Sequence, residues 1–358
     1  MKIKTITPRF FLFISLLFSL ITVNAQTTVY SNDFNIAENP LTSAGNPGTP
    51  AMTWTNVTTG AGTVRTGNFP SGTSNYALQI TNNTSTAGRT YTYGGLSTFS
   101  DPFQATLSSN TNYIIWTLNM RIYRSSTSVG FDVTNGYGSA VVLCADGSNF
   151  LTANGYAVTL MRGTDKNTVR LVKFTGGLSA NANLTTIIGP SAESTSYTDY
   201  YSVKVIYTPA TNKWQLFSRI DGTSIVDPES GTLTQVGTET VDETYTNTAM
   251  SYFGFLFNHQ TTTGPYYTCF DNFKVVATPN ITTDLHVGSQ IRGIVKPISG
   301  GFSVSAENAN VKVYDTTGKL LNNKQVNGTL DFSCASKGLY VIQIKTTTGV
   351  DAIKYVVK

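Results

Sequence analysis

Asn112-Tyr113-Ile114-Ile115-Trp116-Thr117-Leu118-Asn119-Met120-Arg121-Ile122-Tyr123 alternates between apolar and polar side chains over most of its length. An alternation with a period of two predicts a β-strand with one face in a core and the other face outside it. The expected core face carries Ile114, Trp116, Leu118, Met120 and Ile122. The opposite face carries Tyr113, Thr117, Asn119, Arg121 and Tyr123. The run therefore predicts a half-buried strand over residues 112–124.

Shorter runs of the same kind recur on both sides of this strand, with turn residues between them. They are expected at residues 28–34, 76–82, 139–145, 156–162, 168–174, 201–207, 213–220, 251–257 and 268–276. No segment between residues 27 and 277 has a convincing helical period. About a dozen short strands with turns between them are typical of a sandwich of two antiparallel sheets. The fold class is therefore all-β, and no Pro-rich or Ser-rich break divides this part of the chain.

Several short motifs in this part resemble the concanavalin A-like, or laminin G-like, jelly-roll domains of secreted proteins. The runs Ser31-Asn32-Asp33-Phe34 and Cys269-Phe270-Asp271-Asn272-Phe273-Lys274-Val275 are similar to the first and last strands of such domains. Three further motifs lie between them: Thr117-Leu118-Asn119-Met120-Arg121, Gly155-Tyr156-Ala157-Val158 and Lys213-Trp214. The resemblance implies a concanavalin A-like β-sandwich over residues 27–277 that binds glycan or another surface ligand without catalysis.

Residues 284–358 contain short β-rich runs, separated by glycine-containing turns, which predict a small β-sandwich. The runs lie at residues 302–305, 311–314, 319–326, 339–345 and 352–357. Three motifs follow in order: Val311-Lys312-Val313-Tyr314-Asp315-Thr316-Thr317-Gly318-Lys319, Lys337-Gly338-Leu339-Tyr340-Val341-Ile342-Gln343-Ile344 and Lys354-Tyr355-Val356-Val357-Lys358. Together they resemble the C-terminal sorting domain that the type IX secretion system recognises. The residues expected to carry the signal are Tyr314, Gly318, Lys337, Gly338, Tyr340, Lys354 and Lys358.

This resemblance implies a destination. The type IX secretion machinery would be the partner that carries the protein across the outer membrane, and the tail would then be cut off. The protein is expected on the outer cell surface or secreted into the medium. The usual Pro-Asn-Pro opening of the family is replaced here by Thr278-Pro279-Asn280, and residues 278–283 are expected to form a linker.

The N-terminal residues agree with export. Three basic residues precede an apolar run at residues 10–23, and Val23-Asn24-Ala25 offers small side chains for cleavage. These features predict a secretory signal peptide at residues 1–25. The run is too short for a membrane-spanning helix. No later run reaches that length, so no transmembrane segment is expected in the mature chain.

The charge of the body differs from that of the whole chain. The full sequence has a net charge of +4, but residues 27–278 carry 12 Lys and Arg against 15 Asp and Glu, a net charge of −3. The basic residues in excess therefore lie in the two export segments. An acidic body gives no reason to expect nucleic acid as a partner.

The body lacks the motifs of common catalytic sites. Family 16 glycoside hydrolases share the jelly roll and carry Glu-x-Asp-x-x-Glu on one strand, because retaining hydrolysis needs two close carboxylates. The sequence has no such motif, and its nearest acid pairs, Asp227/Glu229 and Asp242/Glu243, lie in loop-like stretches. It also lacks a Gly-x-Ser-x-Gly elbow, a zinc motif and a phosphate-binding loop. No cofactor is expected, with calcium as the one exception.

Two pairs of residues suggest links between strands. Lectin-like sandwiches often hold their loops with calcium, and Asp33 and Asp271 would lie together if the first and last strands pair. Capping of turns by these two acids is the alternative. Cys144 and Cys269 are expected to reach an oxidising compartment, where a disulfide could persist. They could equally be separate core thiols.

The expected ligand-binding residues combine polar and aromatic side chains. Sugars present flat C–H faces that stack on aromatic rings, and their hydroxyls need polar partners. Trp116 and Trp214 alternate with aliphatic residues and are expected in the core. The remaining candidates are Asn119, Arg121, Tyr123, Tyr266, Trp54 and His259. Asn119 and Arg121 would bind hydroxyls, Tyr123 or Tyr266 would stack on the sugar, and His259 could also be a plain loop histidine.

Three functions from different classes follow from the sequence. The leading hypothesis is a secreted or surface protein whose non-catalytic, lectin-like module binds glycan or another surface ligand. The second is a structural or adhesive surface protein without a pocket. The third is a polysaccharide hydrolase or lyase whose site has no recognisable motif.

Overall fold

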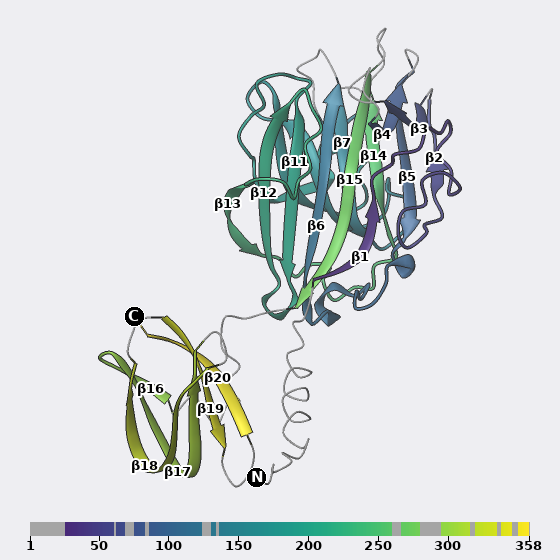
Figure 1. Ribbon diagram of the computed structural model, residues 1–358. Coiled ribbons are helices and arrows are strands. Elements are labelled where there is room, and N and C mark those ends of the chain that lie inside the picture. Colours follow the sequence, from purple (N-terminus) through teal and green to yellow (C-terminus); the bar gives the residue numbers. More distant parts are fainter. Residues whose placement is uncertain are drawn as a thin grey trace, which may run out of the picture. The chain divides into compact units, whose positions relative to one another are not determined.

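The computed structural model describes most of the chain (Figure 1). The described residues are 26–60, 62–68, 75–82, 86–123, 130–133, 136–259, 266–279, 295–315, 319–334, 338–345 and 350–357. They form two compact units that divide near residue 280. The predicted signal peptide at residues 1–25 lies outside the described residues. Thr278 and Pro279, expected to begin the linker, instead end a strand by pairing with Tyr113 and Asn112.

The first unit contains an antiparallel sheet of eight strands, called sheet A (Figure 1). Its order is β13 (Thr234–Val241), β12 (Lys213–Gly222), β11 (Tyr200–Thr208), β6 (Asn112–Tyr123), β15 (Tyr266–Pro279), β4 (Tyr76–Asn82) and β3 (Gly62–Asn68). The first strand, β1 (Thr27–Asn32), pairs with the second half of β15. The strand predicted over residues 112–124 thus lies in the middle of the sheet.

A second antiparallel sheet, called sheet B, has seven strands. Its order is β10 (Leu184–Ile188), β9 (Asn167–Phe174), β8 (Gly155–Arg162), β7 (Gly138–Ala145), β14 (Tyr252–His259), β5 (Gly88–Gly95) and β2 (Thr55–Val57). The helical elements among the described residues are four short 3₁₀ turns: η1 (Leu96–Thr98), η2 (Leu107–Ser109), η3 (Asn181–Asn183) and η4 (Pro209–Thr211). None of these helices is long and apolar enough to cross a membrane.

The main core lies between the two sheets. The apolar face of β6 is fully buried there, and the ring of Trp116 stacks on that of Trp214 at 6.1 Å between centroids. Both tryptophans are core residues, as the alternation predicted. A second apolar cluster that includes Phe150 and Phe174 covers parts of sheet B. The prediction of an all-β, two-sheet jelly roll is confirmed.

Five strands of this unit were not predicted, and four of them lie at sheet edges. These four are β13 and β3 of sheet A and β10 and β2 of sheet B. An edge strand has a neighbour on one side only, so fewer of its side chains need to be apolar. The β13 run Thr-Gln-Val-Gly-Thr-Glu-Thr-Val has a single buried side chain. The interior strand β5 was missed because Gly and Thr hide its alternation.

The second unit is also built from antiparallel strands. They are β16 (Val295–Ile298), β17 (Gly301–Tyr314), β18 (Leu320–Ser333), β19 (Gly338–Lys345) and β20 (Val350–Val357). The two predicted runs 302–305 and 311–314 form one strand, with an irregularity between Ala306 and Ala309. Its core cluster includes Phe302, Val311, Ile342 and Ile344.

The predicted sorting residues are only partly within this description. Tyr340 is 5% exposed and belongs to the core of the unit, and Tyr314 pairs with Val341 of β19. Gly338 opens β19 at a φ of 152°, which favours glycine. Lys354 lies in β20. Gly318, Lys337 and Lys358 lie outside the described residues.

Candidate ligand-binding face of sheet A

The polar face of β6 is the outer face of sheet A, as the alternation predicted, but it is not free. Asn119 has no exposed surface and Arg121 is only 7% exposed. The Asn119 side chain is therefore closed to a ligand, and Arg121 keeps only a small exposed part. The reason lies outside the strand, because residues that are distant in the sequence cover this part of the face.

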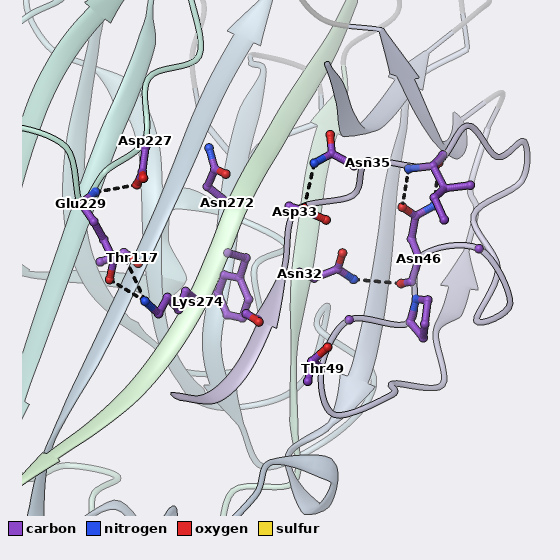
Figure 2. A pocket seen from close by; sticks show the side chains of 16 residues that line it. Asn32, Asp33, Asn35, Asn46, Thr49, Thr117, Asp227, Glu229, Asn272 and Lys274 are labelled. Atoms are coloured by element: carbon purple, nitrogen blue, oxygen red, sulfur yellow. Dashed lines mark hydrogen bonds and ion pairs between the residues drawn. The ribbon is translucent and has the colours of Figure 1, made fainter. Parts of the chain in front are cut away.

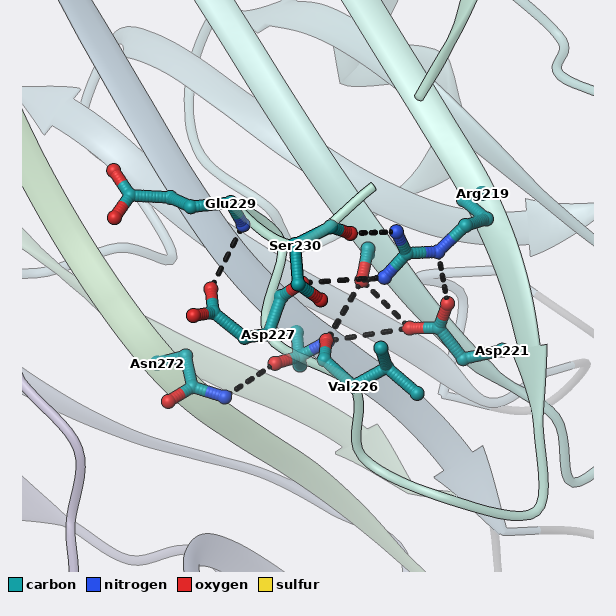
Figure 3. A network of polar contacts seen from close by, with 9 residues as sticks. Arg219, Asp221, Val226, Asp227, Glu229, Ser230 and Asn272 are labelled. Carbon is teal, nitrogen blue, oxygen red and sulfur yellow. Dashed lines mark hydrogen bonds and ion pairs between the residues drawn. The ribbon is translucent and has the colours of Figure 1, made fainter. Parts of the chain in front are cut away.

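Asn119 belongs to a polar network that includes Val226 and Asn272, which are labelled in Figure 3. Its Nδ2 donates to the carbonyl oxygen of Val226 at 2.9 Å and to Ser202 Oγ at 3.1 Å. Its Oδ1 accepts a hydrogen bond from Asn272 Nδ2 at 2.7 Å. Both the nitrogen and the oxygen of this side-chain amide thus have partners, and the amide holds the segment after β12 against the sheet. Asn119 is a structural residue in this fold.

A pocket of about 410 Å³ opens beside this network on the outer face of sheet A (Figure 2). Thr117 and Lys274 form its floor, from the neighbouring strands β6 and β15. Residues 31–33, 35–36 and 45–49 form one wall, and Asp227 and Glu229 form the other. The side chains at its surface are mainly amides, carboxylates and hydroxyls, with Lys274 as the ammonium group.

The first wall is held by an unusual turn after β1. Phe34 has a φ of +51°, a conformation that costs a bulky residue about 1–3 kcal/mol. Its N–H donates to Asn32 Oδ1 at 2.9 Å, and its ring packs edge-on against Phe255 in the core. The turn buries Phe34 and leaves its neighbours Asp33 and Asn35 at the pocket, where Asn35 Nδ2 donates to Asp33 at 2.8 Å.

Asn46 fastens the rest of this wall. Its Nδ2 donates to the carbonyl oxygen of Ile36 at 2.7 Å, and its Oδ1 accepts from the N–H of Ile36 at 3.0 Å. Its backbone carbonyl accepts hydrogen bonds from Asn32 and from the indole of Trp54, both at 2.8 Å. One buried asparagine therefore links the pocket wall to the core.

The second wall is tied down by an ion pair (Figure 3). Arg219 Nε lies 2.6 Å from Asp221 Oδ1, whose side chain is 1% exposed. The same guanidinium donates to the carbonyl oxygens of Ser230 and Asp227. Glu229 reaches across to Lys274 at 2.8 Å, above the floor of the pocket (Figure 2). The sequence placed Asp227 and Glu229 in a loop; the structure adds that the loop faces a pocket.

The two tyrosines proposed for stacking point in different directions. Tyr123 is 38% exposed on the outer face, whereas Tyr266 packs against the core and contacts Tyr137 edge-on. The partner of Tyr123 is Tyr267, with parallel rings 4.7 Å apart. Strand β15 begins at Tyr266, two residues before the predicted start, so the alternation turns Tyr267 outward.

Trp54 and His259 are buried side chains rather than open ones. Trp54 is 7% exposed and packs against Phe34, Phe253 and Phe255. His259 has no exposed surface, ends β14, and lies 3.3 Å from Thr90 Oγ1 through its Nε2. Burial lowers the pKa of His259 from 6.5 to about 4. The expectation of a free Trp54 side chain is therefore wrong, and so is the loop position expected for His259.

The two cysteines of the body are free and lie in different environments. Cys144 belongs to the core between the sheets. Cys269 lies on the outer face of sheet A, where Gln79 Nε2 is 4.0 Å from its sulfur. Opposite sides of sheet A thus separate the two thiols, and the possible disulfide does not form.

Asp33 and Asp271 do come close, as expected if the first and last strands pair. Burial raises the pKa of Asp271 to about 7, hydrogen bonds from Asn75 and from the N–H of Asn272 oppose this effect, and the charge of Asp33 adds to it. Asp271 is 2% exposed and does not reach the pocket surface. Within the described residues no three acidic, histidine or cysteine side chains could hold a metal ion together.

The pH dependence of stability should reveal Asp271. Its raised folded-state pKa contributes stability below its ordinary value of 3.8, and this is lost as the pH rises to about 7. His259 acts in the opposite sense, because its lowered pKa removes stability as the pH falls from 6.5 to about 4. The variant Asp271→Asn should keep only the histidine effect. Thermal unfolding in the presence of a chelator should show a larger loss on acidification than in the wild type, and parallel curves would contradict this assignment.

The acid pair Asp242/Glu243 consists of one half-buried and one exposed residue. Asp242 accepts a hydrogen bond from Tyr156 at 2.8 Å and pairs with Lys173 at 2.6 Å. It therefore joins sheet B to the segment after β13, and the expectation of a solvated loop acid is wrong for it. Glu243 is exposed.

Sequence reasoning missed Asn272 and Lys274 as surface residues of this face. Both lie on β15, whose register shifts between Asp271 and Lys274. Asn272 has a φ of +48° at this irregularity. The motif Asp271-Asn272 could have indicated it, because asparagine is one of the few residues that adopts this conformation easily.

Comparisons with known proteins separate the body from the tail. No curated protein sequence matches the chain. Basic winged bean lectin with Tn-antigen is similar over 71% of this chain and 100% of that chain, at 10% identity and a TM-score of 0.40. The lectin UEA-II complexed with galactose is similar over 70% of this chain and 100% of that chain, at 8% identity and a TM-score of 0.39. The catalytic domain of a glycoside hydrolase family 131 protein from Coprinopsis cinerea is similar over 60% of this chain and 75% of that chain, at 12% identity and a TM-score of 0.34. With TM-scores this low the likenesses carry no argument, and the fold rests on the observed strand order.

The tail gives a definite result. A family model described as a secretion system C-terminal sorting domain matches residues 296–358. This match covers β17 to β20 and most of β16, and it confirms the sorting domain that the motifs indicated. The protein is therefore exported to the cell surface or the extracellular space, and residues 296–358 belong to the sorting-domain family of the type IX secretion system.

Proposed function

We propose that the first unit is a non-catalytic module that binds carbohydrate in the pocket of sheet A after export. The observation that carries this proposal is the pocket itself, of about 410 Å³, with polar side chains converging on it from two walls. Sugar hydroxyls both donate and accept hydrogen bonds, and the lining offers both kinds of partner: carboxylate acceptors at Asp33 and Asp227, and the amide of Asn35.

The walls support binding because they are held in place before a ligand arrives. Asn46 fixes one wall, and Arg219 with Asp221 fixes the other. A pocket that is ordered in advance loses less conformational entropy when it binds. An adhesive protein without a pocket has no need of two such networks on one face.

A hydrolase is the second candidate, because three carboxylates line the same pocket: Asp33, Asp227 and Glu229. Binding is favoured over hydrolysis for two reasons. Glu229 is paired with Lys274, and Asp227 accepts the N–H of Glu229 at 2.8 Å, so both carboxylates already have partners. Asp271, whose raised pKa would suit a proton donor, does not line the pocket.

A glycan array with the purified chain, run beside an assay for released reducing ends, tests the proposal. Asp33→Ala and Asp227→Asn should each weaken binding roughly tenfold or more, since a hydrogen bond to a charged group contributes about 1.5–3 kcal/mol. Glu243→Ala, an exposed acid outside the pocket, is the matched control. If the wild-type chain releases reducing ends and Asp227→Asn does not, hydrolysis rather than binding is the function of the pocket. Binding that is unchanged in both pocket variants would remove this pocket from consideration.

A further inference from the structure

Arg121 is a buried cation without a counter-ion among the residues that the structure describes. It is 7% exposed, its Nε is buried without a hydrogen-bond partner, and it forms no ion pair with any described residue. A guanidinium carries five N–H donors and stays charged at all ordinary pH values. Burying such a group without an anion is unfavourable. The described residues therefore supply no acidic partner for this charged group, and its Nε donor stays without an acceptor.

The surroundings of Arg121 are aromatic. Its Cζ lies 4.6 Å from the ring centroid of Tyr200 and 5.2 Å from that of Tyr123, and Tyr123 in turn stacks on Tyr267. The ring faces attract the cation, and a hydrogen bond between Arg121 and the Tyr200 hydroxyl acts to lower the pKa of Tyr200. We call these four residues the arginine–tyrosine cluster. Tyr123, which is 38% exposed, forms its open rim.

The neighbouring groups that could become anions stay neutral. Burial raises the pKa of Cys269 to about 12. Burial also raises the pKa values of Tyr200 and Tyr267 above their ordinary value, and the Cys269 thiol adds to this, while Arg121 opposes it. None of these three groups therefore neutralises the guanidinium near neutral pH. An anion for Arg121 has to come from outside the described chain.

A second cation lies in the same row of sheet A. The register places Arg65 opposite Gln79, Gln79 opposite Cys269, and Cys269 opposite Arg121. Arg65 is half-buried and donates to Gln79 Oε1 at 2.9 Å. Three strand spacings separate the arginines, about 14 Å along the row. This row carries no acid, so its charges suit a chain with repeated negative groups better than a single ion.

We propose that the arginine–tyrosine cluster binds the carboxylate or sulfate groups of an acidic polysaccharide. Arg121 supplies the charged donors, Tyr123 the open rim, and Arg65 a second contact farther along the chain. This inference rests on the proposed carbohydrate-binding function and names its ligand class. The cluster and the pocket lie on the same face: Arg121 and Thr117 are four residues apart on β6, about 14 Å.

Binding of the purified full chain to three kinds of polymer tests the proposal: a neutral polysaccharide, a polyuronate and a sulfated polysaccharide. The chain should bind the acidic polymers more tightly than the neutral one. Added salt should weaken the binding of the acidic polymers more than the binding of the neutral polymer. Arg121→Met should weaken acidic binding roughly 10–100-fold, by loss of charged hydrogen bonds, and Arg65→Gln less. Arg162→Gln, which changes an exposed arginine at the end of β8, should have no effect.

Thermal unfolding separates a ligand role from a structural one. A buried charge without a partner contributes no stability, so Arg121→Met should unfold at the same temperature as the wild type or a higher one. A lower unfolding temperature with unchanged polymer binding would overturn the proposal. Should Arg121→Met fail to fold, Arg65→Gln and the salt dependence decide the matter in the same way.

The outcomes distinguish this inference from the function on which it rests. Equal affinity for neutral and acidic polymers, with no effect of Arg121→Met, overturns the inference and leaves carbohydrate binding intact. Binding to none of the three polymers overturns both. Binding to only one acidic polymer identifies the anionic group as carboxylate or sulfate and supports the inference.

Discussion

Deletion of residues 284–358 should abolish delivery of the protein to the cell surface and the medium. The reason is the sorting domain at residues 296–358, which the deletion removes. The first unit has its own two sheets and its own core, so the remaining protein should stay folded. Cell fractionation and immunoblotting should find it in the periplasm. Normal surface delivery of the truncated protein would contradict the assignment of the tail.

Point variants refine this test without removing a domain. Tyr340 is 5% exposed in the core of the tail, and replacing a buried aromatic side chain by alanine costs about 3–5 kcal/mol. Tyr340→Ala should therefore unfold the tail and reproduce the periplasmic retention. Leu320→Ala is the matched control, because Leu320 is 47% exposed in the same unit. Equal export of both variants would mean that export does not depend on the folded sorting domain.

Replacement of Asn119 by alanine should destabilise the first unit strongly. The variant leaves the amide of Asn272 without its Asn119 acceptor and removes one of the two hydrogen bonds to the carbonyl of Val226, which keeps the one from Ser202 Oγ. A buried polar group that loses its partner costs about 1–3 kcal/mol. We expect a loss of about 2–4 kcal/mol in the free energy of unfolding, measured by urea denaturation. The segment that Asn119 holds should also exchange its amide hydrogens faster.

The control for this prediction is Asn247→Ala. Asn247 is exposed and accepts one hydrogen bond, from Ser108 Oγ at 2.7 Å. Its replacement should change the stability little, since exposed hydrogen bonds compete with water. Equal stabilities of the two variants would show that the network of Figure 3 does not hold the loop. If Asn119→Ala were stable and lost only ligand affinity, the original interpretation of Asn119 as a sugar contact would return.

Several features of this protein follow from short-range patterns in its sequence. Alternation over residues 112–124 predicted the central strand and its core face, because successive side chains of a strand point to opposite sides. Ordered motifs predicted the sorting domain. Both kinds of signal are local, so no knowledge of the distant chain was needed.

The site depended on contacts between distant segments. Val226 is brought over Asn119 by the loop after β12, and this turns an apparently free polar face into a covered one. The exposure of a polar side chain is set by whichever segment packs on it, and alternation does not report that segment. The same limit applies to Trp54, whose indole N–H finds its acceptor at Asn46 inside the fold.

Register was the other feature that the sequence left open. A shift of one residue in the pairing of a strand turns each of its side chains to the opposite face of the sheet. The predicted strand began two residues later than β15 does, so Tyr266 and Tyr267 were assigned to a loop. The sequence by itself determined the all-β class, the core face of β6 and the sorting domain. Only the tertiary structure decided that Tyr267 faces outward, that Asn119 is buried, and that Arg121 forms no ion pair with any described residue. These properties depend on strand pairing and loop packing over long sequence separations, which local periodicity cannot encode.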